Sequence, residues 1–284
     1  MHKLVLFSLT INLATIDLCE FFLSKMTIKL FYFNKLSNFG DALSPLLFER
    51  LFSHKVEYAD VESCDCMAVG SLLRHLVLKR WKRLARLQFR PVIVWGSGFI
   101  KNCKTQSLRN MDVRLIRGPL SAALLGLENT PFGDPGLLAN ELLQSTPTKR
   151  YRWGIIPHYF DSKLPTIREL CNNTPNHLLI DIAGDPDTVL QQIASCDFIA
   201  SSSLHGLIAA DALNIPNLWL SLSDKLIGGS WKFQDYFLSI GRKLPSPLTL
   251  GKERNLSKFE EGINTNYWQH IPEIQKGIKD SFPY

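Results

Sequence analysis

Short apolar runs alternate with helix-like segments along most of this chain. The pattern predicts β-strands at residues 28–33, 66–69, 92–95, 113–116, 154–156, 178–182 and 198–200. It also predicts helices at residues 42–51 and 119–125, with Pro119 at the start of the second. Alternating strands and helices are typical of a parallel α/β fold, whose binding loops lie at the carboxyl ends of the strands.

The alternation is interrupted at residues 144–150, where a Ser-Thr-Pro-Thr-Lys-Arg sequence breaks the pattern. We therefore predict an N-terminal unit over residues 26–147 and a C-terminal unit over residues 148–245. Residues 246–284 form a tail, and we expect its helix-like stretch at 271–278 to cross back onto the first unit.

The first 25 residues fit the pattern least well. Their apolar run is interrupted by Asp17 and Glu20 before about 18 apolar residues accumulate, which argues against a transmembrane helix. No clear small-x-small cleavage site marks a signal peptide. Met26 directly precedes the first predicted strand, so we interpret residues 1–25 as an upstream extension or leader and Met26 as the start.

The composition fits a globular protein with an anionic partner. The 284 residues are 45% hydrophobic, with a net charge of +6, which suits an anionic ligand or a membrane surface. No zinc-finger spacing or RNA-recognition pattern is present, so we expect no nucleic acid partner. The six cysteines are scattered, and Cys64 and Cys66 are too close for the usual zinc-ligand pair. We expect no metal site, and free thiols in a reducing compartment.

The segment His75–Arg90 carries six basic residues with apolar residues interleaved. Two interpretations stay open. A basic amphipathic helix of this kind lies on anionic lipid, which would give peripheral contact with the inner face of the cytoplasmic membrane. An ordinary helix with a solvated face and an apolar underside is the alternative.

The turn Ser201–Gly206 carries the most informative candidate chemistry. It follows a predicted strand and precedes an apolar-periodic segment, which places His205 at or near a helix N-terminus. Unpaired backbone N–H groups and the positive end of the helix dipole suit a phosphate or carboxylate there. His205 can carry a proton near neutral pH, and Gly206 lets a ligand approach the backbone. A structural role, with the serines as plain N-caps, is the alternative.

Asp41 and Arg117 also follow predicted strands. Arg117 suits a bidentate contact with an anion, or else marks the surface at a helix start. Asp41, in the turn that begins at Asn38, either takes part in the chemistry or caps the helix that follows.

Three further positions complete the candidate binding loops. His158 follows a strand and either contacts a substrate or lines the cleft, whereas Asp134 precedes a proline and fits a simple turn. Gly96 lacks the third glycine of a dinucleotide-binding fingerprint, so it is expected to allow close approach of the backbone.

These motifs, taken in order, resemble the polysaccharide pyruvyl transferases, most closely the bacterial branch that forms ketals on exopolysaccharides. The resemblance covers roughly residues 26–245. The matching segments are 38–45 (NFGDALSP), 94–98 (VWGSG), 117–121 (RGPLS), 133–138 (GDPGLL), 156–159 (IPHY), 201–212 and 215–216.

The resemblance implies a fold, a reaction and a place in the cell. The expected fold is GT-B-like, with two Rossmann-like domains whose parallel sheets face a cleft. The expected enzyme moves the pyruvyl group of phosphoenolpyruvate onto two hydroxyls of one sugar, which forms a pyruvate ketal. The implied acceptor is a lipid-linked oligosaccharide at the inner face of the cytoplasmic membrane, so the implied location is cytoplasmic. No metal or cofactor beyond the donor substrate is expected.

The resemblance also assigns roles to residues. His205 and Arg117 match the histidine and arginine of the family's phosphoenolpyruvate site, so we expect His205 to carry the proton and Arg117 to clamp the anion. We hypothesise that Asp41 binds or deprotonates an acceptor hydroxyl, with Asp134 as the second candidate. The other expected substrate-binding residues are Asn38, Gly96, Ser97, Gly118, His158, Ser202, Ser203 and Gly206.

One position departs from the family pattern. Many relatives have Arg-Leu-His-Gly where this chain has Ser203-Leu204-His205-Gly206, so one expected cation is missing. Arg114, Arg152 or Lys232 could replace it.

Two other functions remain open. A nucleotide-sugar glycosyltransferase could use the same type of fold, although the Glu-rich donor motif expected of it does not occur between Asp224 and Arg242. A non-catalytic scaffold in polysaccharide assembly is the other alternative.

Overall fold

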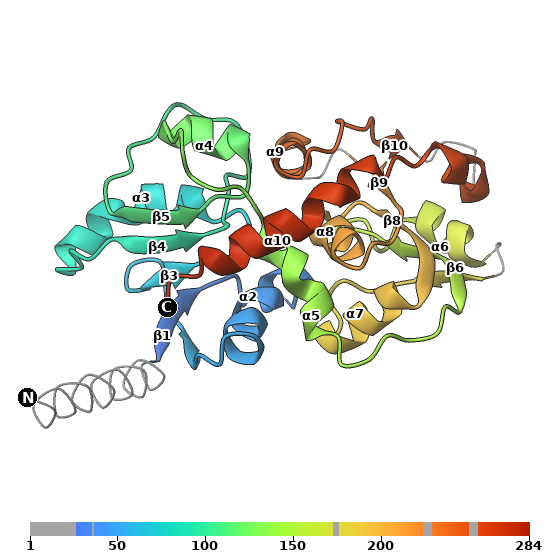
Figure 1. Cartoon of the computed structure of the whole chain (residues 1–284), viewed down its shortest axis with the longest axis horizontal. Helices are drawn as coiled ribbons and strands as arrows, with labels where there is room; N and C mark the ends of the chain where they lie inside the picture. The colour runs from blue at the N-terminus through green and yellow to red at the C-terminus, as the bar shows by residue number, and fades with distance from the viewer. Residues whose placement is uncertain (1–26, 36, 173–175, 224–228, 250–254) are drawn as a thin grey trace, which may run out of the picture.

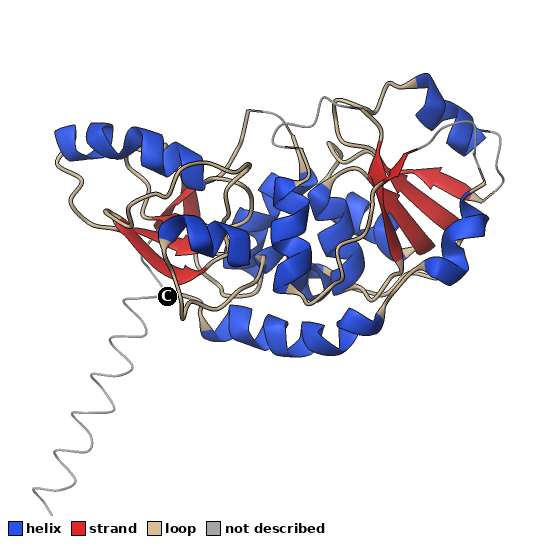
Figure 2. Cartoon of the chain, turned by 90° about the horizontal axis from the view of Figure 1, so that it is seen from above, coloured by secondary structure: helices blue, strands red, loops and turns tan. Residues whose placement is uncertain are grey.

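Two five-stranded parallel sheets form the frame of the protein, each flanked by helices (Figures 1 and 2). The computed structural model describes residues 27–35, 37–172, 176–223, 229–249 and 255–284. The predicted upstream extension therefore lies outside the described residues. The chain is an α/β protein, as predicted.

The first sheet has the strand order β2-β1-β3-β4-β5, and all its pairings are parallel. Its strands are β1 (Ile28–Phe31), β2 (Val56–Tyr58), β3 (Cys66–Met67), β4 (Val92–Trp95) and β5 (Met111–Leu115). The helices of this unit are α2 (Phe39–Arg50), α3 (Leu73–Ala85) and α4 (Pro119–Leu125), followed by η1 (Pro135–Leu138) and α5 (Ala139–Leu142).

The second sheet has the order β10-β9-β8-β6-β7 and is again parallel throughout. Its strands are β6 (Tyr151–Ile156), β7 (His177–Leu179), β8 (Cys196–Ser201), β9 (Asn217–Ser221) and β10 (Leu248–Thr249). The other elements are α6 (Pro165–Asn172), α7 (Pro186–Ala194), α8 (Leu204–Ala212), α9 (Trp231–Ser239), η2 (Leu256–Gly262), η3 (Asn266–His270) and α10 (Ile271–Asp280).

Every predicted strand overlaps a strand of the structure, but the pattern missed β2, β9 and β10. β2 has Glu57 between its two apolar residues, and Leu248 is the one apolar residue of β10. β9 contains an apolar run at residues 218–220 that the pattern did not predict as a strand. The predicted start of the first helix is corrected from Ala42 to Phe39. The side chain of Asn38 accepts a hydrogen bond from Gly40 N at 3.1 Å, so Asn38 is the N-cap of α2 and Asp41 is not.

Both sheets reverse their strand order at an inner strand. The chain leaves β1 towards β2 and returns to place β3 on the other side, and β6 has the same relation to β7 and β8. Ligands of open α/β sheets bind at such reversals, beyond the carboxyl ends of the strands. The two reversal points lie between β1 and β3 and between β6 and β8.

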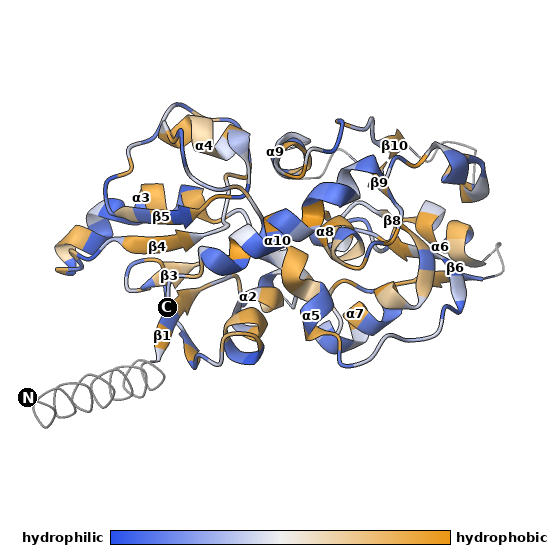
Figure 3. Cartoon of the chain, viewed as in Figure 1, coloured by the Kyte–Doolittle hydropathy of each residue, from blue (hydrophilic) through white to orange (hydrophobic). Residues whose placement is uncertain are grey.

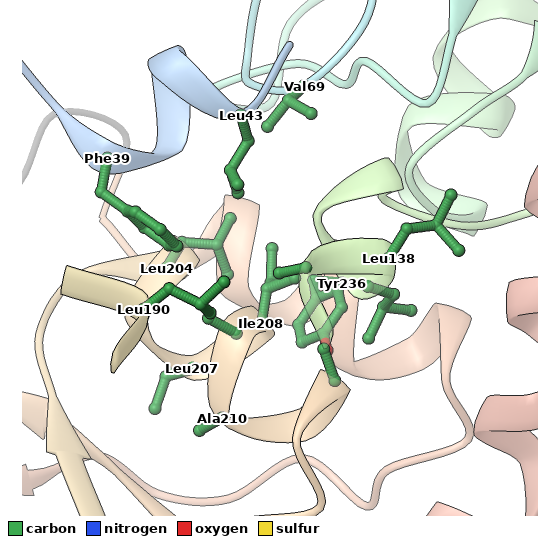
Figure 4. Packing of buried hydrophobic residues seen from close by; sticks show 14 of the residues in the cluster. Phe39, Leu43, Val69, Leu138, Leu190, Leu204, Leu207, Ile208, Ala210 and Tyr236 are labelled. Atoms are coloured by element: carbon green, nitrogen blue, oxygen red, sulfur yellow. The ribbon is translucent and has the colours of Figure 1, made fainter. Parts of the chain in front are cut away.

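The largest hydrophobic core lies between the two sheets and draws on both. Figure 4 shows Phe39 and Leu43 of α2 lying against Leu204 and Ile208 of α8, with Leu138 of η1 beside them. Figure 2 shows these helices between the two sheets. A shared core of this kind fixes the helix N-termini of one unit relative to the loops of the other.

The tail crosses back onto the first unit, as expected. Figure 1 shows α10 (red) running across both units to the C-terminus beside the first sheet. The Trp95 indole donates a hydrogen bond to Ile278 O at 3.0 Å, and Gln275 donates to Leu137 O at 2.7 Å. Beyond α10, the Phe282 ring stacks on Phe52 with centroids 3.6 Å apart. The predicted residue boundaries of the two units stay a prediction.

A buried carboxylate joins four elements of the second unit. Asp211 of α8 accepts hydrogen bonds from Tyr236 of α9 at 2.8 Å, Tyr267 of η3 at 2.7 Å and Asn217 of β9 at 2.7 Å. The guanidinium of Arg242 lies 3.9 Å from the same carboxylate. Asp211 is fully buried, so its partners compensate for water that cannot reach it.

We expect Asp211→Ala to lower the free energy of unfolding by about 3–5 kcal/mol. The substitution removes the carboxylate that accepts hydrogen bonds from three buried side chains and lies beside the buried Arg242. Urea unfolding followed by circular dichroism measures the loss. Asp187→Ala is the matched control, since its ion pair with Arg50 is exposed and is expected to contribute less than about 1 kcal/mol. Equal losses in the two variants would contradict the role assigned to Asp211.

Candidate functional site

His205 is the second residue of α8, which follows the carboxyl end of β8 at the reversal point between β6 and β8. This confirms the prediction that it lies at a helix N-terminus. Gly40, in the first turn of α2, faces the ring, and a Cβ at that position would lie 1.9 Å from His205 Nδ1. A glycine is therefore required at position 40, and the first unit supplies one wall of the histidine site.

The other ring nitrogen of His205 faces an acid without bonding to it. His205 Nε2 lies 4.0 Å from Asp134 Oδ2, and both atoms are buried without a hydrogen-bond partner. The other oxygen of Asp134 accepts a hydrogen bond from Gly136 N at 2.9 Å, which caps η1. One carboxylate oxygen of Asp134 therefore stabilises the start of η1, and the other has no hydrogen-bond partner within the described residues and faces the imidazole of His205.

The backbone around Asp134 is held by a close approach at Gly96. Gly96 has φ of +85°, and a Cβ there would lie 2.1 Å from the Pro135 ring. Only glycine fits both the conformation and the contact. Gly96 thus positions the Asp134 turn, and its predicted contact with substrate stays a prediction.

Lys232, on the first turn of α9, is a cation whose charge influences the ionisable groups of the site. Its charge acts on Asp41, His158 and His205. Within the described residues, no carboxylate lies in ion-pair distance of its ammonium group. Arg114 is paired with Asp112 and Arg152 with Glu260, both at exposed positions. Of the three candidates for the missing cation, the structure therefore brings only Lys232 to His205.

Burial and these positive charges shift the protonation of the histidines. Burial first, then Lys232 and Arg117, lowers the pKa of His205 to about 3. Burial and Lys232 lower the pKa of His158 to about 4. Both rings are consequently neutral at physiological pH.

Burial raises the pKa of the two acids, whereas it lowers the pKa of the lysine as it does that of the histidines. Burial raises the pKa of Asp41 to about 7, although Lys232 acts against it. Burial also raises the pKa of Asp134 to about 6, against the Gly136 hydrogen bond and Arg117. Burial lowers the pKa of Lys232 to about 8. Asp41 and Lys232 therefore titrate close to neutral pH, where general acids and bases are most effective.

Arg117 is fully buried, and its guanidinium is occupied by protein oxygens. It donates to Asp235 Oδ2 at 3.0 Å, to Ser71 Oγ at 2.7 Å and to Phe99 O at 2.5 Å. Ser121 donates to the same carboxylate from N and Oγ. The observed role of Arg117 is to join the first unit to α9 of the second, and the anion clamp predicted for it stays a prediction.

Several other predicted residues serve the architecture of the site. Gly118 lets α9 approach, since a Cβ there would lie 2.0 Å from Asp235 O, and Gly206 packs against Ser201 Oγ. Ser97 Oγ donates to Gly70 O at 2.8 Å. Ser203 is the N-cap residue of α8 without a side-chain cap bond. Their predicted contacts with substrate stay predictions.

Ser202 connects the segments that follow β6 and β8. Its hydroxyl accepts a hydrogen bond from His158 N at 2.8 Å and lies 3.5 Å from Asp161 Oδ2, to which it donates. Asp161 is fully buried and also accepts a hydrogen bond from Ser223. Sequence reasoning missed Asp161 and Asp235, because neither lies in a motif and each is defined only by partners far along the chain. Asp161, three residues after His158 at a strand end, offered the one weak signal.

The arrangement brings together a neutral histidine, two carboxyl groups of raised pKa and a lysine beside a helix N-terminus. Such a set can bind an anion and exchange protons with a ligand. Within the residues that the structure describes, no group of three or more His, Cys, Asp or Glu side chains could hold a metal ion.

Comparisons with known proteins give the following likenesses. A family model described as "Polysaccharide pyruvyl transferase" matches residues 20–224. The uncharacterized protein L143 of Acanthamoeba polyphaga mimivirus is 29% identical over 228 residues, which covers 75% of each chain. The succinoglycan biosynthesis protein ExoV of Rhizobium meliloti (strain 1021) is 25% identical over 207 residues, which covers 72% of this chain but only 62% of ExoV.

A solved structure also matches, that of a functionally uncharacterized protein from Klebsiella pneumoniae subsp. pneumoniae NTUH-K2044. It is 13% identical, with a TM-score of 0.44, over 86% of this chain and 98% of that one.

We expect the imidazoles of His205 and His158 to stay neutral from about pH 8 down to about pH 5, where an ordinary histidine titrates near 6.5. Both shifts have the same sign, because burial and Lys232 disfavour the added proton. Nuclear magnetic resonance of ¹⁵N-labelled histidine measures the titration, and His205→Asn and His158→Asn assign the signals. A midpoint near 6.5 for either ring would contradict this description of the site.

Proposed function

The chain belongs to the polysaccharide pyruvyl transferase family, whose model matches residues 20–224, and from this premise we propose that it is a ketal-forming pyruvyltransferase. Family membership and the likeness to ExoV support a role in pyruvyl transfer during polysaccharide biosynthesis. The proposal adds phosphoenolpyruvate as the donor and a cyclic pyruvate ketal on a sugar as the product.

One observation carries the proposal: the free, buried Nε2 of His205 facing the free, buried oxygen of Asp134. Two unpartnered polar atoms are costly in a protein interior, so a structure that keeps them at 4.0 Å is prepared for a proton between them. We assign His205 as the proton carrier, and Asp134 as the residue that positions its ring and balances its charge.

The donor is a small dianion or trianion and requires cations and backbone N–H groups. The N-terminus of α8 offers unpaired N–H groups beside His205. Lys232 supplies the charge that the family pattern places at Ser203. Arg117 contributes through its buried positive charge, while its guanidinium holds Asp235.

Donor binding itself makes His205 an acid. A neighbouring anion favours the protonated imidazole and opposes the effect of Lys232, so the pKa of His205 rises when phosphoenolpyruvate binds. The protonated ring then faces the Asp134 carboxylate, and the pair can close to a hydrogen bond.

The chemistry balances with two hydroxyl groups and one donor. A proton from His205 goes to the methylene carbon of phosphoenolpyruvate, and a sugar hydroxyl attacks the cationic C2. The C2–O bond to phosphate then breaks, inorganic phosphate leaves, and the second hydroxyl closes the ring. One hydroxyl proton restores His205, and Asp41 takes the other and passes it to the departing phosphate. Asp41 is the base for the hydroxyl, since its pKa of about 7 suits proton removal at neutral pH.

The proposal extends to the setting of the reaction. The two sheets would face a cleft in the manner of GT-B enzymes, with a sugar or lipid-linked oligosaccharide as acceptor. The acceptor would enter beside Asp41 and His158. A lipid-linked acceptor would place the protein in the cytoplasm, at the inner face of the membrane.

The test is phosphate release from phosphoenolpyruvate, with and without a lipid extract of the source cell, followed by mass analysis of the glycan. We expect release that depends on the acceptor, and a pyruvyl group on the product. His205→Asn should lower the rate by about 10²-fold or more while the protein stays folded. Sugar transfer from a nucleotide sugar instead of phosphate release would contradict the proposal, and full activity of His205→Asn would refute the proton carrier.

We expect Lys232→Met to raise the KM for phosphoenolpyruvate by about 10- to 100-fold, because a hydrogen bond to a charged group contributes about 1.5–3 kcal/mol. The kcat at saturation should change less. Initial rates over a range of donor concentrations separate the two constants. Lys243→Met, at an exposed position beyond α9, is the matched control and should leave both unchanged. An unchanged KM in Lys232→Met would remove Lys232 from the donor site.

A further inference from the structure

The four most exposed large apolar side chains in the described residues all lie on one segment, α3 and the turn after it. Leu78 is 62% exposed, Trp81 64%, Leu87 74% and Phe89 67%, whereas no other large apolar side chain in the described part of the chain exceeds 46%. Single exposed apolar residues are normal at a protein surface, but a cluster of this kind marks an interaction site.

The helix separates its two faces clearly. Leu73 and Leu76 are buried against the first unit, and Arg83 is buried with them. The Arg83 guanidinium donates to Val61 O at 2.8 Å and to Cys64 O at 3.1 Å, so this arginine fastens the helix to the fold. Arg83 is therefore removed from the basic surface that the sequence suggested.

The opposite face carries apolar and basic side chains together. Leu78, Trp81 and Lys82 are exposed on the helix, and Arg74 lies one turn before them. Arg86 and Arg90 are exposed beyond the helix end. Figure 3 shows hydrophilic and hydrophobic stretches alternating along α3, and Figure 1 places this helix at the end of the first unit that faces away from the second.

The turn that follows α3 presents a leucine in an unfavourable conformation. Leu87 has φ of +58°, in the left-handed region where helix ends normally have glycine or asparagine. Gln88 N donates to Arg83 O at 3.0 Å and Leu87 N to Leu84 O at 3.0 Å, which fixes this turn. The fold thus holds a large apolar side chain out in water at a backbone position that disfavours it.

The charges of the segment restrict what it can bind. Residues 73–90 contain no Asp or Glu, so the exposed cations favour an anionic partner. Only Lys79 has an acidic partner in the described residues, Glu62 at 2.9 Å. A second copy of the same face would bring like charges together. A nucleic acid would satisfy the cations but leave the four apolar side chains in water.

We propose that α3 and the turn after it form a docking surface for an anionic lipid bilayer, with Leu78, Trp81, Leu87 and Phe89 inserted and the arginines and lysines at the headgroups. An aromatic and aliphatic tip inside a basic rim matches the interfacial zone of a bilayer, where apolar burial and headgroup attraction add. No helix among the described residues is long and apolar enough to cross a membrane. The proposal stands whether or not the proposed transferase activity is confirmed.

The test is co-sedimentation of the full chain with vesicles of phosphatidylcholine alone or mixed with phosphatidylglycerol. We expect binding only to the mixed vesicles, and weaker binding in high salt. The Trp81→Ser/Leu87→Asn variant should bind the mixed vesicles at least about tenfold more weakly than the unmodified chain. Asparagine tolerates the left-handed backbone conformation at position 87, so the turn is kept. Lys82→Glu/Arg86→Glu should lose at least about tenfold as well, since each basic residue near the surface contributes about 1 kcal/mol.

Matched variants on the second unit separate this surface from general surface properties. Leu238→Ser/Leu244→Asn removes two other exposed leucines, and Lys163→Glu/Lys243→Glu reverses two other exposed lysines. Both should bind like the unmodified chain, and urea unfolding verifies that every variant is folded. Absent binding of the unmodified chain would overturn the proposal. Equal losses of binding in the α3 variants and the control variants would also overturn it. A loss in Lys82→Glu/Arg86→Glu alone would show that the apolar side chains do not insert, and would overturn it as well.

Discussion

The ion pair between Arg117 and Asp235 is the constraint on which the candidate site depends. It joins the loop after β5 in the first unit to α9 in the second, and both side chains are fully buried. Gly118 permits the contact, because any side chain there would collide with the backbone of Asp235. Lys232 lies three residues before Asp235 on α9, so both side chains leave the same side of the helix. The buried pair therefore also holds the turn of α9 from which the charge of Lys232 acts on His205.

A site assembled in this way concentrates ionisable groups in a region that excludes water. Without a ligand, burial and two cations keep His205 neutral, and burial brings the pKa of Asp41 to about 7. The positive charge of Lys232 has no acidic partner in ion-pair distance within the described residues. An anionic donor would supply the missing negative charge, and its arrival would change the protonation of the groups around it. Burial of these ionisable groups costs folding free energy, and it also makes their pKa values sensitive to a bound anion.

Helix α3 connects this site to the far surface of the first unit. It begins two residues after Ser71, which accepts a hydrogen bond from Arg117, and it ends beside the exposed Leu87. Its inner face is fixed by buried leucines and by Arg83, so the outer face is held in a fixed relation to the buried pair. If the bilayer holds one end of this helix, a lipid-linked acceptor would reach the site from a defined direction.

The sequence by itself determined the parallel α/β class, the positions of the longer strands and the loops that carry His158 and His205. Apolar periodicity is a local property of the chain, and the carboxyl ends of parallel strands collect their loops at one edge. Motif order was enough to suggest the family. β2 and β10 escaped prediction because neither lies in an apolar run, whereas the equally short β3 and β7 do.

Only the tertiary structure decided which charges meet. The sequence suggested an anion clamp at Arg117, and the structure shows that its guanidinium is bound by Asp235, more than a hundred residues away. The sequence favoured a simple turn as the role of Asp134. In the structure, one of its carboxylate oxygens has no hydrogen-bond partner among the described residues and faces His205. Lys232 was one of three candidate cations until the packing of α9 placed its charge on the site. Burial and long-range pairing set these roles, and both depend on the folded arrangement of distant segments, which no local pattern of residues contains.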